Sequence, residues 1–507
     1  MERSWPVITE KLHSPDFSAF AELATKGFAF VPVFRQITSD ALTPVLAYAR
    51  IVGDATDSFL FESVIGGEKP GRYSFLGANP LEKIQVKGNT LTKFRPGKPP
   101  VSWESQDPLD EIQHHLNTCR APHFPGLPRF LGGAVGYLGY DTVRFVENLP
   151  NTPHDDRALA DVVLGFYRSM VVFDQITKTI FVVVHAQVEG DLPANYAAAC
   201  HEVDQLTSRL AEPIGLPIQD VRPLGEVTKE YTSNFEPEAF EAAVESCKEY
   251  IRAGDIFQVV LSQRLKTKTT ATPLSIYRAL RVVNPSPFLF LVRSDNLSLI
   301  GSSPEIMVRV EEGLATIRPL AGTRKRGKTP DEDEALAREL LGDPKERAEH
   351  IMLVDLGRND IGRVSQFGSV TLKDVLTVEK YSHVMHLCST VQGQLKEKCS
   401  PMDALKACLP AGTLSGAPKV RAMEIIDQFE PHKRGPYGGA VGYIDFSGNM
   451  DTCIALRTIV MMGDTAFVQA GAGIVADSVP SLEREETLNK ARGLLRAIEV
   501  AEKQFGE

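Results

Sequence analysis

Small residues and isolated polar side chains alternate through the last third of this 507-residue chain. Between residues 409 and 490 the sequence contains LPAGTLSGAPKVRAM, GPYGGAVGYI, CIALRT, QAGAGIVADS and SLEREETLNKAR. Glycine lets the backbone approach a ligand closely, and single arginines, threonines and a tyrosine stand beside these small residues. A packing core does not need this mixture, whereas a site that grips a small anion through a metal ion does.

Two acids and a lysine near the end of the chain have the spacing of one helical face. Glu483, Glu486 and Lys490 are three and four residues apart, so on a helix they point the same way. Magnesium takes oxygen ligands and often uses only one or two protein carboxylates together with water and substrate. The same residues also suit an ordinary Glu486–Lys490 ion pair and acids that favour the helix dipole, so both interpretations stand.

Short strands and helices, mixed without regular βαβ alternation, must position these residues. Strand-like runs are SMVVFD, TIFVVVHA, FQVVLSQRL, SLIGSSPEIMVRV and LATIRPLAG. Helical periodicity over residues 240–251 predicts a helix with Asn234 as N-cap and Gly254 as its stop. Further helices are predicted over residues 331–341 and 344–356 and after Pro480. The pattern favours an α+β fold with large antiparallel sheets.

A proline-rich polar stretch over residues 211–235 is the best candidate for a domain boundary. It divides the chain into an N-terminal domain, residues 1–220, and a C-terminal domain, residues 221–507. The run LGGAVGYLGYD at residues 131–141 partly echoes GGAVGYIDF at residues 438–446. The echo indicates either an internal duplication of a strand hairpin or a coincidence.

Composition narrows the class of protein. The formal net charge of −10 makes a nucleic-acid partner unexpected, and 43% hydrophobic residues suffice for a large core. Seven scattered cysteines without a CxxC pair fit a reducing compartment. The start, MERSWPVITEKLHS, lacks the apolar stretch of a signal peptide, and no apolar run is long enough to span a bilayer. We therefore expect a cytoplasmic protein that binds neither nucleic acid nor membrane.

The run GTRKRGKT at residues 322–329 satisfies the phosphate-loop pattern GxxxxGK[ST], so a nucleotide-binding protein is one alternative. Against it, the loop centre carries Arg324, Lys325 and Arg326, which are bulky where a phosphate must reach bare amides. Pro330 follows at once, as the first residue of a helix capped by Thr329. A solvated or anion-attracting basic loop is the simpler interpretation.

Taken together, the motifs of the last third, with FLFESVIGGEKPGRYSFLG near the start, resemble the chorismate-utilising enzymes. The similarity is greatest to the large subunits that form anthranilate, and it covers nearly the whole chain. It implies large antiparallel sheets packed as a sandwich, with helices outside and the two halves interlocked. It also implies that the second domain is the chorismate-binding catalytic domain.

Two positions bear on the reaction type within that family. Relatives that form isochorismate or salicylate carry a lysine base where this chain has Gln258, and relatives that form aminodeoxychorismate usually carry a nucleophilic lysine where it has Ala321. Neither glutamine nor alanine can do that chemistry. The resemblance therefore implies direct attack of ammonia on chorismate and loss of pyruvate, giving anthranilate for tryptophan biosynthesis. An aminodeoxychorismate or aminodeoxyisochorismate synthase, which stops at the amino intermediate, and a non-catalytic amino-acid sensor remain alternatives.

The resemblance also assigns roles to individual residues. It makes Glu349 and Glu486 ligands of Mg²⁺, with Glu483 acting through water, and makes His386 the base that removes the ring proton. Glu305 becomes the acid for the departing hydroxyl. Isolated residues of these types are often structural: a histidine in an apolar run, a loop carboxylate. Substrate contacts are implied for Tyr437, Arg457, Gly322, Thr323, Thr413, Gly471, Gly473 and Lys490, with Thr323 also counted among the catalytic residues.

A second site is implied for feedback inhibition by tryptophan. Glu62 and Ser63 match one segment of it, and Pro287, Phe288 and Leu289 match its partner strand; alternatively these are only core strands. Phe61 and Phe288-Leu289 depart from the family pattern, which puts the strength of inhibition in doubt. Because the chain lacks a GxCxG nucleophile loop, glutamine-derived ammonia requires a separate glutamine amidotransferase subunit, anthranilate synthase component II.

Overall fold

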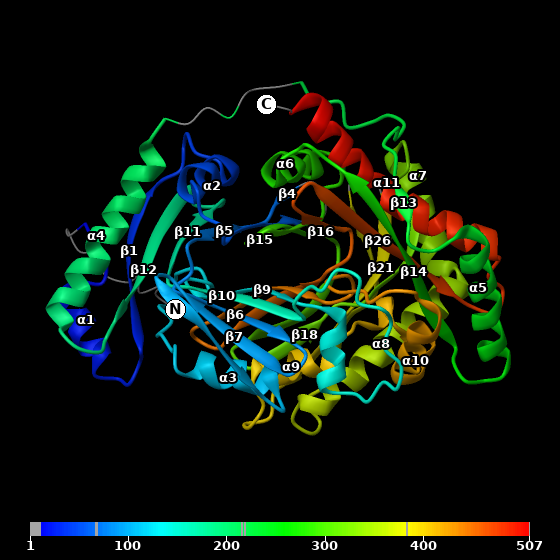
Figure 1. Cartoon of the computed structure of the whole chain (residues 1–507), viewed down its shortest axis with the longest axis horizontal. Coiled ribbons are helices and arrows are strands. Elements are labelled where there is room, and N and C mark those ends of the chain that lie inside the picture. Colours follow the sequence, from blue (N-terminus) through cyan, green and yellow to red (C-terminus); the bar gives the residue numbers. More distant parts are fainter. Residues whose placement is uncertain (1–11, 66–68, 214–215, 217–219, 382–383, 506–507) are drawn as a thin grey trace.

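The strands stack as two large antiparallel sheets with helices on the outer faces (Figure 1). The computed structural model describes residues 12–505 apart from 66–68, 214–215, 217–219 and 382–383. Each large sheet has twelve strands, and each half of the chain contributes one block of neighbouring strands to both sheets. The predicted α+β sandwich with interlocked halves is confirmed. Within the described part, no helix has the length and apolar character to cross a membrane.

The first and the last strands along the chain both lie in the first sheet. In spatial order its strands are β1 (Phe30–Thr38), β12 (Thr179–Gln187), β11 (Ser169–Asp174), β5 (Tyr73–Ala78), β2 (Ser58–Glu62), β15 (Phe288–Ser294), β16 (Leu297–Ser303), β25 (Thr458–Met462), β26 (Thr465–Ile474), β14 (Gln258–Lys268) and β13 (Thr232–Ser233), with β22 (Gly416–Ala417) beside β14.

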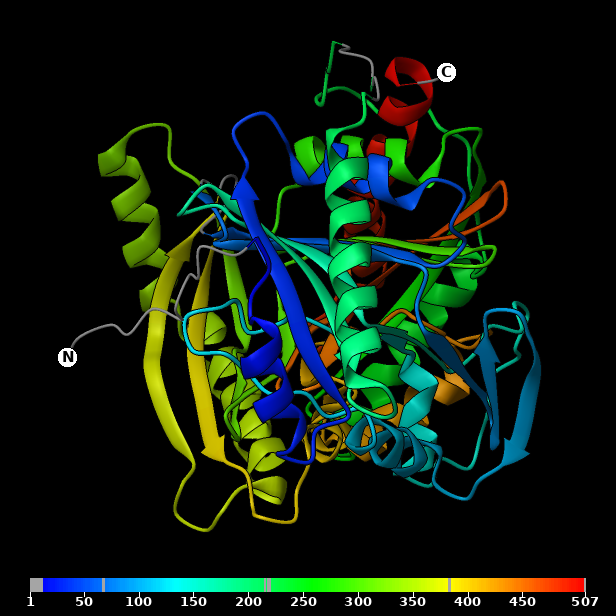
Figure 2. The same ribbon diagram turned by 90° about the vertical axis from the view of Figure 1, so that its left-hand side faces the viewer.

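The second sheet lies below the first in Figure 1. Its order is β19 (Leu320–Lys325), β21 (Val384–Gln394), β18 (Leu314–Ile317), β17 (Ile306–Glu311), β24 (Met450–Ile454), β23 (Ala440–Asp445), β9 (Gly133–Leu138), β10 (Val162–Tyr167), β6 (Glu82–Lys87), β7 (Thr90–Arg95) and β8 (Lys98–Glu104), with β20 (Thr371–Lys380) beside β21. The hairpins β20–β21 and β7–β8 form its opposite edges (Figure 2). A small pair, β3 (Val64–Ile65) and β4 (Lys69–Pro70), stands apart.

In each sheet the strands on one side of a central pair correspond, position by position, to the strands on the other side. In the first sheet β5, β11, β12 and β1 follow β2 outward in the way that β16, β25, β26 and β14 follow β15. In the second sheet β10, β6, β7 and β8 follow β9 as β24, β17, β18 and β21 follow β23. In both halves the chain visits these positions in the same sequence. The topology is that of an internal duplication with approximate two-fold symmetry.

The echoed sequence runs lie at this axis. β9 and β23 are antiparallel neighbours, and Gly136 pairs with Gly442 at the centre of the two GAVGY segments. A Cβ added to Gly136 would lie 1.9 Å from the carbonyl oxygen of Val163 on the neighbouring β10, so only glycine fits there. Of the two explanations for the echo, duplication therefore agrees with the structure, and it extends to whole sheets.

Helices cover the outer face of each sheet. The first sheet is covered by α2 (Pro44–Val52), α4 (Leu192–Ala211), α6 (Pro273–Val283), α11 (Pro480–Gln504) and α5 (Pro237–Arg252), and α1 (Phe17–Ala24) packs beside α4. The second is covered by α8 (Pro344–Val364), α9 (Pro401–Cys408), α3 (Pro108–Asn117) and α7 (Pro330–Gly342). The helix α10 (Lys419–Phe429) packs on β14, and η1 (Tyr140–Phe145) and η2 (Gly412–Leu414) are short 3₁₀ turns.

The predicted N-cap of α5 is wrong. The helix begins at Pro237 with Glu236 in the cap position, whereas the Asn234 side chain accepts a 2.7 Å hydrogen bond from the Arg264 N–H of β14. The Asn234 side chain therefore binds the backbone of a strand and does not cap the helix. The predicted stop is right in position, because Gly254 follows the last turn with a φ of +85°. All seven cysteines are unpaired.

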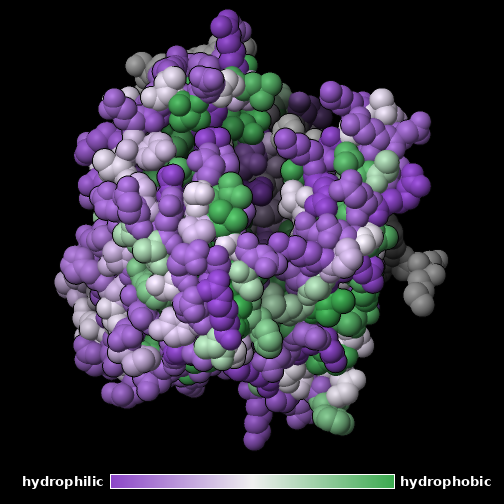
Figure 3. All heavy atoms as spheres, turned by 90° about the vertical axis from the view of Figure 1, so that its right-hand side faces the viewer, coloured by the Kyte–Doolittle hydropathy of each residue, from purple (hydrophilic) through white to green (hydrophobic). Residues whose placement is uncertain are grey.

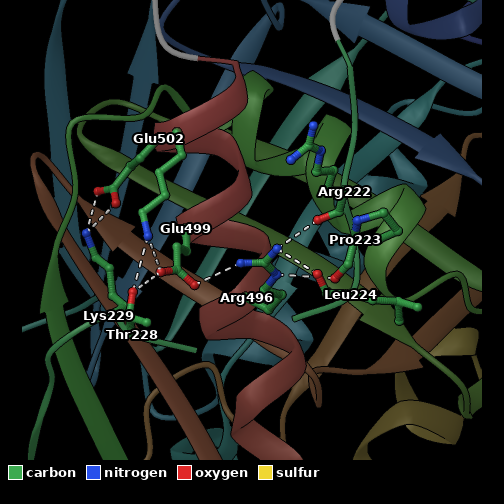
Figure 4. A network of polar contacts seen from close by, with 9 residues as sticks. Arg222, Pro223, Leu224, Thr228, Lys229, Arg496, Glu499 and Glu502 are labelled. Atoms are coloured by element: carbon green, nitrogen blue, oxygen red, sulfur yellow. Dashed lines mark hydrogen bonds and ion pairs between the residues drawn. The ribbon is translucent and has the colours of Figure 1, made fainter. Parts of the chain in front are cut away.

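The segment between α4 and α5 is tied to the terminal helix. Arg496 of α11 donates to the backbone oxygens of Arg222 (2.8 Å) and Leu224 (2.9 Å), and it contacts Glu499 at 3.1 Å (Figure 4). Glu499 also accepts a 2.6 Å bond from Lys503. The stretch predicted as a boundary is therefore held to the second half; the division at residue 220 itself stays a prediction.

Candidate active site

Helix α8 carries Glu349 toward β14. Gln258 donates a long 3.4 Å hydrogen bond from Nε2 to Oε1 of Glu349. Burial raises the pKa of Glu349; the negative charge of Glu346 raises it further, while Gln258, Lys345 and Lys490 lower it. A carboxylate held in this way lacks a close cationic partner.

The start of α11 brings the second group of acids. Lys490 Nζ lies 2.8 Å from Glu486 Oε1 and donates to the backbone oxygen of Gly471 at 3.0 Å. Burial and the charge of Glu486 raise the pKa of Glu483, which Lys490 and Lys345 lower. The charges of Lys345 and Lys490 act on both Glu349 and Glu483, so the two helices that carry the predicted metal ligands face one region of the molecule.

These acids suit a magnesium ion that takes one or two ligands from the protein and the others from water and substrate. Among the described residues no three His, Cys, Asp or Glu side chains lie close enough to enclose a metal. Mg²⁺ commonly keeps several waters and binds through one or two carboxylates plus substrate. Burial is the main cause of the raised pKa values of Glu349 and Glu483, and the charges of Glu346 and Glu486 add to it; a divalent cation nearby would favour the ionised carboxylates. The donor set therefore suits the ion.

Two glycines of β26 bring backbone close to the site. A Cβ on Gly473 would lie 2.5 Å from Gln258 Nε2, and one on Gly471 would lie 3.0 Å from the Tyr437 hydroxyl. Tyr437 is buried, and its ring lies 5.6 Å from the Arg434 guanidinium. Side chains at either glycine would fill the space that the predicted substrate contacts share.

His386 on β21 is held as a neutral base. Its Nδ1 lies 2.9 Å from the Gly322 carbonyl oxygen and 3.1 Å from the Thr323 hydroxyl. Burial lowers the pKa of His386, the Gly322 carbonyl raises it, and the charge of Arg457 lowers it again. A proton on Nδ1 that is donated to Gly322 leaves the Nε2 lone pair available. The neighbouring His383 lies outside the described residues.

Arg457 stands at the turn from β24 to β25 in a left-handed conformation, with φ of +48°. Burial lowers the pKa of its guanidinium, and no carboxylate of the described residues forms an ion pair with it. A desolvated cation without a partner is costly, and a positive φ at a non-glycine residue is strained. Together they indicate a site built for an incoming anion.

Glu305, in the turn between β16 and β17, is 7% exposed. Burial raises the pKa of this carboxyl to about 8, although the Thr413 hydroxyl and the Leu320 N–H lower it. At neutral pH the group is mostly protonated, so it can donate a proton. Neutral His386 and protonated Glu305 thus form an acid and a base on neighbouring segments.

The predicted feedback residues line one cavity of about 480 Å³ between the sheets. Its aromatic part comes from Phe61, Tyr73, Phe75, Phe288, Phe290 and Tyr443, and Glu62, Ser63, Pro287 and Leu289 complete that wall. The Glu62 carboxylate accepts from the Tyr277 hydroxyl at 2.7 Å and pairs with Arg281 at 2.9 Å. Glu62 therefore meets an amino group only with oxygens that already have partners.

The nucleotide-binding alternative is wrong. In the loop between β19 and α7, the Gly327 N–H donates to Asp333 (2.9 Å) and the Lys328 N–H donates to Glu332 (2.8 Å). These amides are capped by carboxylates of the following helix, so they cannot cradle a phosphate.

Much of the cavity wall was missed by sequence reasoning. Among the missed residues, Arg318, Glu379 and Tyr381 line the cavity together with its aromatic part. Their one signal was proximity to recognised motifs: Arg318 stands just before PLAGTR, and Tyr381 five residues before His386.

The face presented by α5 and α11 is largely hydrophilic and hollowed in its upper half (Figure 3).

Comparison with known proteins gives consistent matches. The family model described as chorismate binding enzyme matches residues 59–496. Anthranilate synthase component 1 of Acetivibrio thermocellus is 48% identical, with 95% of this chain and 97% of the relative covered. The protein of that name from Pseudomonas aeruginosa is 46% identical, with 95% of this chain and 98% of the relative covered.

Solved structures agree. The crystal structure of anthranilate synthase component I from Streptococcus pneumoniae superposes with a TM-score of 0.76 at 39% identity, covering 90% of this chain and 99% of that one. The menaquinone-specific isochorismate synthase of Escherichia coli, at 18% identity and a TM-score of 0.66, shares the fold over 95% and 98%. The chain belongs to the chorismate-binding enzyme family.

Proposed function

We propose that this chain is the large subunit of an anthranilate synthase. It converts chorismate and ammonia into anthranilate, pyruvate and water, the first committed step of tryptophan biosynthesis. The proposal rests on Arg457, which has no carboxylate partner among the described residues and lies near enough to lower the pKa of His386, and on Glu305, whose pKa burial raises to about 8. The relatives named anthranilate synthase component 1 support it over 95% of the chain.

The acid and the base serve successive steps. The Glu305 carboxyl donates its proton to the ring hydroxyl, which leaves as water while ammonia bonds to the ring. His386 Nε2 then removes the ring proton as the enolpyruvyl group departs as pyruvate, and the ring becomes aromatic. Gln258 cannot deprotonate an attacking water, and Ala321 cannot attack the ring. Both absences favour ammonia as the nucleophile.

Charged and polar groups hold the two carboxylates of chorismate. Arg457 and Tyr437 bind the enolpyruvyl carboxylate, for which a guanidinium offers a two-pronged donor. Gly322, Thr323, Thr413, Gly471 and Gly473 add hydroxyl and backbone contacts, and Lys490 offsets negative charge. Glu349 and Glu486 would hold Mg²⁺, with Glu483 acting through water. When bound, the ion neutralises the ring carboxylate.

Tryptophan is the proposed inhibitor of this chain. Its indole suits the aromatic part of the cavity, and Ser63 and the Pro287–Leu289 segment lie at the cavity wall. A glutamine amidotransferase subunit, component II, supplies ammonia from glutamine; the name component 1 of the relatives supports such a partner. Seven unpaired cysteines are consistent with a cytoplasmic location.

The test is anthranilate fluorescence from the purified chain with chorismate and an ammonium salt, with magnesium and then with excess chelator. Magnesium-dependent signal supports the reaction and the metal together. Chorismate consumed without anthranilate or pyruvate would indicate a synthase that stops at the amino intermediate. Intact chorismate combined with tryptophan binding would indicate a non-catalytic sensor.

A further inference from the structure

The polar wall of the cavity is a connected group. Arg318 Nη2 pairs with Glu379 Oε1, and the Tyr381 hydroxyl donates to Glu379 Oε2 at 2.9 Å. All three side chains line the cavity. We call this group of Arg318, Glu379 and Tyr381 the shared wall.

The other side of the shared wall meets the catalytic histidine. The Tyr381 ring packs edge-on against the His386 imidazole, with centroids 5.6 Å apart and planes at 62°. Glu379 on β20 is the strand-pairing partner of His386 on β21. Contacts from a neighbouring strand and its following residue therefore set where the imidazole lies.

A second connection runs along the chain from Arg318. Four residues later, Gly322 offers the carbonyl oxygen that fixes His386 Nδ1 at 2.9 Å. The segment from Arg318 to Gly322 thus contributes a cavity residue at one end and the orienting acceptor of the base at the other. Movement of either end changes the geometry of His386.

The electrostatics of His386 also depend on this wall. Burial lowers the pKa of the imidazole most, the Gly322 carbonyl raises it, Arg457 lowers it and Glu379 raises it, while the ring of Tyr381 packs beside it. Arg318 Nε is buried without a hydrogen-bond partner, so the network is only partly satisfied. Partly satisfied polar networks in a low dielectric respond strongly to small rearrangements.

We propose that the shared wall positions the His386 imidazole and transmits occupancy of the cavity to it. The inference rests on the proposed function, in which an aromatic amino acid fills the cavity and His386 is the base. A ligand that touches Glu379 or Tyr381 turns the imidazole away from the ring proton. Inhibition then acts on the proton-removal step and does not require closure of the substrate site.

The decisive variant is Tyr381→Phe, which keeps the ring and removes only the hydrogen bond to Glu379. Tyr250→Phe is the matched control, because it also removes a single tyrosine hydroxyl, one that donates to Gln428 at 2.9 Å on the surface, away from the cavity. Tryptophan binding is measured by calorimetry, turnover by anthranilate fluorescence, and the titration of His386 by NMR. Far-ultraviolet circular dichroism checks folding.

We expect Tyr381→Phe to lower kcat about tenfold with little change in KM, because a small misplacement of a catalytic group has a large effect on rate. The pKa of His386 measured by NMR should rise, because Glu379 loses the Tyr381 hydroxyl that shares its negative charge. Tryptophan should still bind, but saturating tryptophan should inhibit much less. Tyr250→Phe should keep the kcat, the His386 titration and the maximal inhibition of the unaltered chain.

Glu379→Gln gives an opposite sign as a second check, because loss of the negative charge should move the His386 titration down. Unchanged titration and full inhibition in both variants would overturn the proposal. Absence of tryptophan binding by the unaltered chain would instead refute the feedback part of the proposed function and the transmission with it. The NMR titration, which needs no turnover, then decides whether the wall positions His386.

Discussion

At the scale of single residues, the raised pKa of Glu305 has a measurable consequence for stability. Burial raises the pKa of this carboxyl to about 8 in the folded chain, from an ordinary value of 4.5. Between these values the folded state binds a proton that the unfolded state releases, so the contribution of Glu305 to stability falls as pH rises through that window. Above pH 8 the loss is complete.

Glu305→Gln tests this, because glutamine mimics the protonated carboxyl. Relative to the unaltered chain, the variant should gain stability steadily from pH 5 to pH 8, measured as the free energy of unfolding in urea at several pH values. Turnover should fall about 100-fold or more, since the amide cannot act as an acid. Parallel stability curves would contradict the assigned pKa.

Gly473 provides a second prediction at the same scale. A Cβ there would lie 2.5 Å from Gln258 Nε2, the end of a flexible side chain. Gly473→Ala should therefore leave the fold intact but push Gln258 from Glu349, raising the KM for chorismate about tenfold. Gly493→Ala on α11 is the control: nothing lies within 4 Å of its added Cβ, so its KM should not change. Equal KM values for both variants would remove Gly473 from the site.

Long sequence motifs identified candidate residues, whose roles stay predictions, but gave no sign of the residues that surround them. His386, Glu305 and Arg457 could be found because each stands in a long, specific motif. The shared wall could not, because Arg318 and Glu379 are 61 residues apart and meet only through the pairing of β18, β19 and β20 with β21. Strand register over such separations is set by the whole sheet and leaves no local signal.

At the scale of elements, the predicted ends of helices agree with the structure where no tertiary contact opposes the local sequence signal. The helix predicted over residues 344–356 continues to Val364, because Gly357 does not end it. A Cβ on Gly357 would lie 2.3 Å from Ile317 Cδ1, so this glycine permits close packing of α8 on the second sheet. The predicted helix thus ended one residue before this glycine, which lies inside the helix and makes a contact.

The tie between α11 and the segment before α5 is a testable feature of this scale. Arg496 is 14% exposed and Glu499 2% exposed, and Arg496→Met removes the bonds to three backbone oxygens and to Glu499 while keeping the aliphatic stem. We expect a loss of about 1–3 kcal/mol in the free energy of unfolding. Chemical denaturation measures it.

Arg492→Met is the matched control one turn earlier on the same helix. Arg492 is 58% exposed and pairs only with the exposed Glu485 and the nearby Asn489. Such a surface pair contributes about 0.5 kcal/mol or less. Similar losses in both variants would mean that the tie does not hold the segment.

At the scale of the whole molecule, the interlocked sheets make each half depend on the other. The first sheet joins β2 of one half to β15 of the other, and the second joins β9 to β23. A fragment ending at residue 220 would expose both central edges with their unpaired backbone groups, and so would the remainder. Exposed edges of this length favour aggregation.

Residues 1–220 and 221–507 expressed separately should therefore be insoluble or lack a cooperative thermal transition. Expressed together they should assemble into one species, because the pairings β2–β15 and β9–β23 supply each other's missing edge. Copurification through a tag on one fragment, followed by a thermal melt, is the measurement. The cavity takes Phe61 and Phe75 from one half and Phe288 from the other, so tryptophan binding should appear only in the assembled pair. A second fragment that alone folds cooperatively and binds tryptophan would show that the halves are independent domains after all.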